Sequence, residues 1–193
     1  MTHDKVLVDC DSEFAEFIDT MRILKEKLGP MVLQFPKFDK CVLKSSGEFL
    51  GRLDSFLKRV SDPALRFAVE IRNKDWLNSR LTEALRAHNV ALALTDTSFM
   101  PRPWEIRGNL DLVTADFAFV RWLGNRKGIE QQTTTWDKTV VDRTQDLRNW
   151  VDVFKSFVRN AKVLKIFAFA NNHYAGFGPG TVKLFWDLWN KKE

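Results

Sequence analysis

Five short apolar runs recur along the chain, and a stretch with helical periodicity separates each run from the next. The runs are MVLQF (31–35), FAVEIR (67–72), VALALT (90–95), FAFVRW (117–122) and KIFAFA (165–170). Because they are nearly continuous in apolar residues, they are typical of parallel strands buried on both faces. Strands that alternate with helices in this way predict an α/β fold, with a parallel sheet and helices packed outside it.

The stretches between the runs carry apolar residues at the spacing of an amphipathic helix. The expected helices cover residues 11–28, 48–60, 77–87, 137–159 and 182–189. The most regular is 137–159, and Gly29-Pro30 supplies a stop signal after the first helix. No domain boundary or internal repeat divides the 193 residues, so we expect a single domain over residues 1–193.

The composition is that of a soluble globular protein, with 45% hydrophobic and 28% charged residues. No apolar run approaches the roughly 20 residues that a membrane-spanning helix needs, and residues 1–10 lack the pattern of a signal peptide. The two cysteines, Cys10 and Cys41, form no disulfide framework. We therefore expect a cytoplasmic protein that does not associate with membranes.

The formal net charge of +5 favours anionic partners, because it steers them toward the surface. Such partners include small phosphate or carboxylate compounds and nucleic acid. The alternative is a mildly basic surface without a dedicated partner. Charges of both signs are spread along the chain, and no block of Lys and Arg marks a nucleic-acid-binding tail.

Each of the five runs ends in polar or charged residues. These are Gln34, then Glu70 and Arg72, then Thr95 and Asp96, then Arg121, and finally Asn171, Asn172 and His173. Parallel strands place their carboxyl ends at one edge, which is where α/β proteins build ligand sites. We therefore expect these side chains to converge around a shared hollow.

A hollow with this lining predicts an enzyme that acts on a small anionic substrate by hydrolysis or proton transfer. Arginines hold phosphate or carboxylate groups through charge-assisted bonds, and a buried carboxylate beside them serves as acid or base. The expected catalytic residues are Glu70, Asp96 and His173. The expected substrate-binding residues are Gln34, Arg72, Trp76, Arg121, Asn171 and Asn172. No metal-ligand spacing, cofactor fingerprint or strong catalytic motif is present.

Structural explanations stand beside these roles. Glu70 with Arg72 or Arg121 can form a buried ion pair that only fixes the interior. Asp96 can cap the turn that follows it, and Asn171-Asn172 can hold a tight turn.

A rival function is a nucleic-acid-binding module, because arginines lie near aromatic residues that can stack on bases. The aromatic residues concerned are Trp76, Trp104, Trp122 and Trp136. The alternative is that most of them anchor the core or its loops.

Several segments, taken in order, resemble those of the YecE-like proteins, a family catalogued as domain of unknown function 72. The segments are LGPMVLQFP, FAVEIRNKDW, ADFAFVRWLG, DRTQDLRNW and FAFANNHYAGFGPGT. The resemblance covers nearly the whole chain. It implies a TIM-type (β/α) barrel with a site at the strand ends, in a family without an established reaction.

The resemblance also implies that the barrel is incomplete. The chain is similar to strands four to eight, since Thr2-His3 resembles the pair that follows the third strand of family members. A complete barrel needs about 250 residues. We therefore expect about five parallel strands with outer helices, and two long apolar edges through which the chain self-associates or meets another partner. A truncated, inactive fragment is the remaining alternative.

Overall fold

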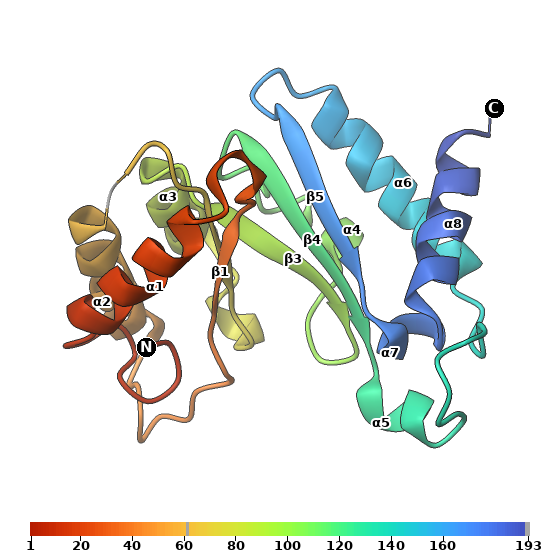
Figure 1. Cartoon of the computed structure of the whole chain (residues 1–193), viewed down its shortest axis with the longest axis horizontal. Helices are drawn as coiled ribbons and strands as arrows, with labels where there is room; N and C mark the ends of the chain where they lie inside the picture. Colours follow the sequence, from red (N-terminus) through yellow and green to blue (C-terminus); the bar gives the residue numbers. More distant parts are fainter. Residues whose placement is uncertain (61, 192–193) are drawn as a thin grey trace.

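A computed structural model of the protein describes residues 1–60 and 62–191. The strands in this part are β1 (Met31–Gln34), β2 (Phe67–Glu70), β3 (Ala91–Thr97), β4 (Phe117–Gly124) and β5 (Lys165–Ala170). They form one sheet in the order β1-β2-β3-β4-β5, and every neighbouring pair is parallel (Figure 1). The prediction of an α/β fold with five parallel strands is confirmed, and the strand order is that of an incomplete barrel.

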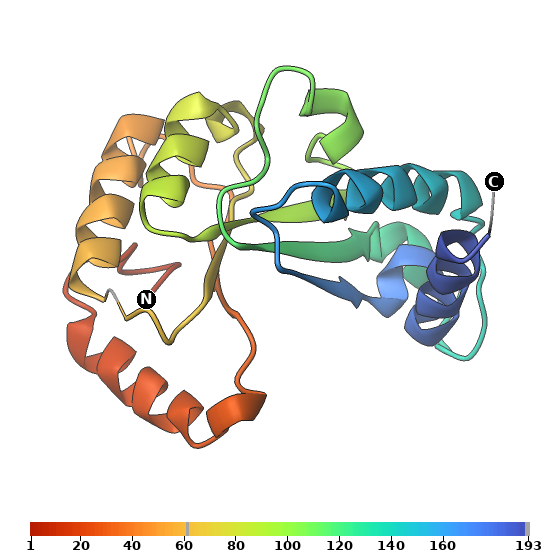
Figure 2. The same ribbon diagram turned by 90° about the horizontal axis from the view of Figure 1, so that it is seen from above.

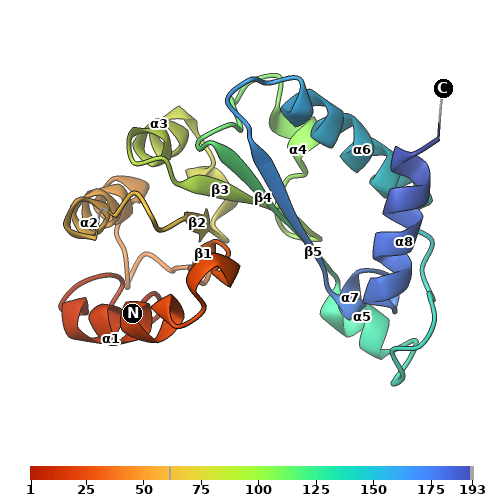
Figure 3. The same cartoon turned by 45° about the horizontal axis from the view of Figure 1, so that its top comes forward.

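Helices connect the strands and cover one face of the sheet. They are α1 (Asp11–Arg22), α2 (Ser46–Arg59), α3 (Ser79–Ala87), α4 (Pro103–Ile106), α5 (Arg126–Glu130), α6 (Thr144–Val158), α7 (Asn172–Ala175) and α8 (Gly178–Trp189), with 3-10 turns η1 (Lys25–Lys27) and η2 (Lys74–Trp76). Figures 2 and 3 show α2 and α3 beside the β1–β3 half of the sheet, and α6 and α8 beside β4 and β5. None of the helices in the described part of the chain combines the length and the apolarity needed to cross a bilayer.

The two faces of the sheet have different neighbours. On the outer face, strand residues pack with the apolar stripes of the long helices into the main core, which includes Leu33, Val69, Leu92, Val120 and Trp122. The inner face carries a smaller cluster made of Ala68, Ala91, Ala93, Ala115, Phe117 and Phe119, with Val32 and Phe167 against it. Side chains alternate along a strand, so a residue in the inner cluster has strand neighbours that point to the outer face, and a residue in the main core has strand neighbours that point to the inner face.

The two largest differences between expected and observed boundaries concern helices. The helix expected over 137–159 begins at Thr144, because the N–H groups of Val140 and Val141 donate to Ala175 O at 2.8 and 3.2 Å and hold the preceding segment beside α7. The helix expected over 11–28 ends at Arg22. Lys25 has a φ of +51°, which an α-helix cannot accommodate.

Candidate functional site

Glu70 is the last residue of β2, and its carboxylate is almost fully buried on the inner face. The residue is 1% exposed. Its neighbour Val69 lies in the outer core and Ala68 lies in the inner cluster, so alternation points Glu70 inward. A buried carboxylate must be paired or hydrogen-bonded, and the partners of Glu70 define the candidate site.

Arg121 of β4 reaches Glu70 across the intervening strand β3. Its Nη1 forms an ion pair with Glu70 Oε2 and donates to Gln34 Oε1 at 3.3 Å. Gln34 and Glu70 are register partners on β1 and β2. The inner face of β3, which lies between Arg121 and Glu70, carries the small side chains of Ala91 and Ala93 and, by alternation, of Thr95, and side chains of this size leave room for the arm of Arg121.

Arg72 approaches the same carboxylate from the segment after β2. Its Nε and Nη2 each lie 3.4 Å from Glu70 Oε1. The guanidinium carbon also lies 5.9 Å from the centre of the Phe99 ring, a geometry that favours cation–π attraction. Phe99 follows β3 and is 50% exposed, so it forms a rim beside Arg72.

We call Gln34, Glu70, Arg72 and Arg121 the Glu70 cluster. It contains two guanidinium groups for one carboxylate, and the arginine side chains remain 35% and 27% exposed. Within residues 1–60 and 62–191, Nη1 of Arg72 and both Nε and Nη2 of Arg121 have no hydrogen-bond partner. The cluster therefore retains one positive charge and several N–H donors that can bind an anion.

Asp96 does not join this cluster, contrary to the expected convergence. It is in register with Trp122, which lies in the outer core, whereas its neighbour Thr95 is in register with Arg121. Asp96 therefore points toward the helices. The sequence could not distinguish the two directions, because both faces of β3 are buried.

Donors from three segments surround Asp96. Trp150 Nε1 and Tyr174 Oη both donate to Oδ2 at 2.9 Å, and Arg102 Nε donates to Oδ1 at 3.1 Å. Burial, together with the charge of Asp96, raises the pKa of Tyr174 above its ordinary value, so the phenol stays a donor. We call these four residues the Asp96 cluster. Its geometry fits a structural role, in which the Asp96 carboxylate connects β3 to α4, α6 and α7.

The residues after β5 form a compact turn instead of extending the strand. Asn171 Oδ1 accepts the N–H of His173 at 2.9 Å and caps α7. Asn172 Oδ1 accepts the N–H of Gly178 at 2.8 Å at the start of α8. His173 contacts Asn171 Oδ1 through Nδ1 at 2.8 Å and Glu130 Oε1 through Nε2 at 3.2 Å, and it packs against the ring of Trp136.

These contacts engage the side-chain oxygens of Asn171 and Asn172 and both ring nitrogens of His173, and none of them involves the Glu70 cluster. Trp76 also lies elsewhere: its ring stacks on Phe49 and Phe38, with centroid distances of 5.0 and 6.1 Å. Of the nine predicted site residues, the structure brings together Gln34, Glu70, Arg72 and Arg121. The functional roles of all nine remain predictions.

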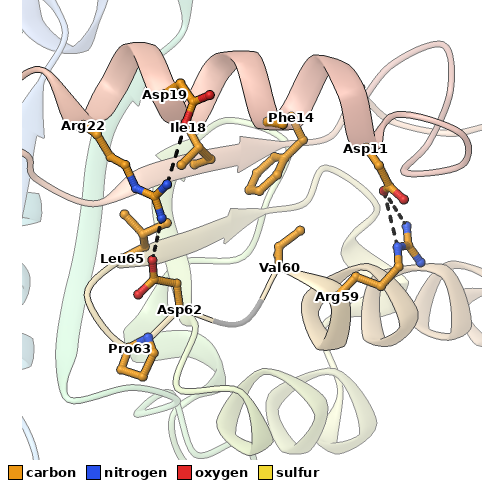
Figure 4. A pocket seen from close by; sticks show the side chains of 11 residues that line it. Asp11, Phe14, Ile18, Asp19, Arg22, Arg59, Val60, Asp62, Pro63 and Leu65 are labelled. Atoms are coloured by element: carbon orange, nitrogen blue, oxygen red, sulfur yellow. Dashed lines mark hydrogen bonds and ion pairs between the residues drawn. The ribbon is translucent and has the colours of Figure 1, made fainter.

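A hollow of about 550 Å³ lies between α1 and the segment that leads from α2 to β2, and Figure 4 shows the side chains that line it. It contains two arginines, but each is paired: Arg22 with Asp62 at 2.8 Å and Arg59 with Asp11 at 3.1 Å. The hollow shares no residue with the Glu70 cluster, and its compensated charges give it no preference for an anion. Among the described residues, no three His, Cys, Asp or Glu side chains gather as metal ligands.

Sequence reasoning missed Phe99 at the Glu70 cluster and the Trp150 and Tyr174 donors at Asp96. Phe99 lies in an irregular connection, where no sequence periodicity indicates the direction in which its side chain points. Trp150 carries a clear helical signal, but only the packing of α6 on β3 shows that its indole N–H meets a carboxylate. These contacts are set by tertiary structure.

The comparisons with known proteins agree with the fold described above. The family model described as "Protein of unknown function DUF72" matches residues 1–193. A crystal structure of a DUF72 family protein of Thermotoga maritima (TM1631) is similar, with a TM-score of 0.71 and 21% identity over 98% of this chain and 70% of that chain. A DUF72 family protein of Enterococcus faecalis (EF0366) gives a TM-score of 0.65 and 14% identity, over 98% of this chain and 72% of that chain.

At these identities the solved structures show the fold alone. Comparison with curated proteins finds no significant match. The family model and the shared parallel sheet confirm the resemblance drawn from the strand-end segments: the chain belongs to the family described as protein of unknown function DUF72.

Proposed function

We propose that the inner face of the sheet binds a small anion, a phosphate or a carboxylate, at the Glu70 cluster. The supporting observation is an excess of positive charge: two guanidinium groups share the single buried carboxylate of Glu70. The carboxylate orients both guanidinium groups, and the remaining positive charge attracts the ligand. Guanidinium groups suit this task because their planar donors match the oxygens of phosphate and carboxylate.

Catalysis would use the same arrangement. Glu70 is the carboxylate nearest to an anion bound by Arg72 and Arg121, so it would accept a proton during hydrolysis or proton transfer. The two arginines would stabilise negative charge that develops on the substrate. Asp96, which lies on the other face of the sheet, would stabilise the fold and would not contact the ligand.

The geometry gives less support to nucleic-acid binding. Trp122 is buried in the outer core, Trp76 stacks on Phe49, and Trp104 meets Trp150 edge-on at 5.6 Å. Their rings face protein neighbours, whereas a stacking platform for bases needs open aromatic faces.

Isothermal titration of the protein with inorganic phosphate, and separately with citrate, tests the proposal. Arg121→Gln should weaken binding at least about tenfold, since a charge-assisted hydrogen bond contributes roughly 1.5–3 kcal/mol. The control Arg80→Gln makes the same change of charge at an exposed position on α3, and it should bind as the unmodified protein does. Equal weakening by both variants would mean that overall charge, and not this cluster, attracts the anion.

A further inference from the structure

The two edges of the sheet are protected to different degrees. Strand β1 has four residues, and prolines stand close to both of its ends, at Pro30 and Pro36. Short edge strands flanked by proline resist pairing with another chain. Strand β5 is longer and contains no proline. An incoming strand would therefore meet less obstruction at β5.

The free edge of β5 is apolar and accessible. Leu164 is 77% exposed and Phe169 is 52% exposed. The N–H of Asn171, directly after β5, donates to Trp122 O of β4 at 2.9 Å, and the backbone groups of successive strand residues point to opposite sides. Lys165, Phe167 and Phe169 alternate in step with Asn171 and therefore bond toward β4, whereas the backbone groups of Ile166 and Ala168 point away from β4 and can bond to another strand.

Helix α8 presents a second apolar surface at the same end of the molecule. It packs on β5, and Figure 3 shows no helix beyond it on that side. Val182 and Trp186, one helical turn apart, are 49% and 61% exposed. A neighbour that covered only the strand edge would leave Trp186 in water. A partner that offers both a strand and a helix would cover the two apolar surfaces together.

We propose that this partner is a second copy of the chain, related by a two-fold axis at the free edge of β5. The axis would pair β5 antiparallel with β5 of the partner subunit, and Phe167 would lie opposite Phe169 of the partner subunit. Aromatic cross-strand pairs of this kind stabilise antiparallel sheets. The same axis brings α8 beside α8 of the partner subunit, so that the two Val182–Trp186 surfaces cover each other.

Charge complementarity supports an identical partner. Lys183 and Asp187 form an ion pair of 2.8 Å beside the apolar surface of α8. When two such helices run antiparallel, Lys183 approaches Asp187 of the partner subunit, and opposite charges meet on both sides of the axis. A surface that is complementary to itself is the requirement for a two-fold interface.

Sedimentation equilibrium over a range of protein concentrations tests the proposal. The unmodified chain should show a reversible dimer. Phe169→Lys and Trp186→Lys should each raise the dimer dissociation constant at least about tenfold, because each places a charge in an apolar contact. The control Ile23→Lys alters a 76% exposed residue after α1 and should leave the dimer intact. Circular dichroism establishes that each variant is folded.

A cysteine cross-link tests the strand register. With Cys41 replaced by Ser, Ala168→Cys should form a disulfide between subunits on mild oxidation, since the proposed axis passes through position 168. A chain that stays monomeric at every concentration overturns the proposal. A dimer that Ile23→Lys disrupts and Phe169→Lys does not, or one that fails to cross-link, places the interface elsewhere and overturns it as well.

Discussion

Glu70 and Asp96 are both buried carboxylates near the carboxyl ends of neighbouring strands, and their surroundings differ. Glu70, on the inner face, is held by two partly exposed guanidinium groups and, in the described part of the chain, by no neutral aromatic donor. Asp96, on the outer face, receives an indole N–H, a phenol O–H and one guanidinium N–H. The two residues are 1% and 2% exposed, so burial alone does not distinguish them.

The two carboxylates differ in how many hydrogen-bond donors of their partner side chains remain unused. The donors of Trp150 and Tyr174 are single and are used up by Asp96. The guanidinium groups of Arg72 and Arg121 keep donors that Glu70 does not occupy. A carboxylate whose partners have used their donors fits a structural role. A carboxylate whose partners keep unused donors fits a site that binds a ligand. Three substitutions test this contrast, in order of decreasing effect on stability.

The largest effect is expected for Asp96→Ala. It leaves the indole, the phenol and the half-buried guanidinium of Arg102 without their acceptor, and breaking such a set of bonds to a buried carboxylate costs about 3–5 kcal/mol. Urea unfolding followed by tryptophan fluorescence measures this loss. Variant protein that remains folded should still bind phosphate. Loss of phosphate binding in the folded variant would contradict the separation of the two clusters.

An intermediate effect is expected for Glu70→Gln. The amide keeps the shape of the side chain but removes the negative charge, so stability without ligand should fall by about 1–3 kcal/mol. Phosphate should bind more tightly, because the cluster then carries two uncompensated positive charges, and phosphate should restore part of the lost stability.

Titration calorimetry and thermal unfolding with and without phosphate measure the effects of Glu70→Gln. The exposed Glu83→Gln on α3 changes the net charge equally and serves as the control. Weaker phosphate binding in Glu70→Gln than in the control would show that Glu70 does not oppose the anion.

The smallest effect, about 1–2 kcal/mol at neutral pH, is expected for Tyr174→Phe, which removes one hydrogen bond to Asp96. Burial and Asp96 raise the pKa of the Tyr174 phenol in the folded state. The stabilising O–H is therefore fully retained below the unfolded pKa of about 10, and its contribution is lost as the pH rises above that value.

Unfolding measured between neutral and strongly alkaline pH checks the sign of this effect. The unmodified protein should lose stability above pH 10 more steeply than Tyr174→Phe. Identical slopes in the two proteins would mean that Tyr174 does not titrate with unfolding.

Much of the fold and about half of the candidate site follow from local patterns. The apolar runs predicted the five parallel strands, and the alternation within FAVEIR predicted that Glu70 and Arg72 share a side. The direction of Asp96 was not predictable, because the neighbouring residues Thr95 and Thr97 are buried as well. At the end of β5, the structure confirms the alternative of a tight turn held by Asn171, whose side chain accepts the N–H of His173; the pattern of residues allowed an extended strand equally, because periodicity does not indicate side-chain capping.

The small side chains on the inner face of β2 and β3, Ala68, Ala91 and Ala93, affect how this site can change in evolution. Arg121 reaches Glu70 across β3, a strand whose inner face carries the small side chains of Ala91 and Ala93. Exchanging Ala93 for a bulkier residue would redirect that arm without altering any polar group. Under the function proposed above, changes in such apolar residues would alter the choice of ligand, and a survey of charged positions alone would overlook them.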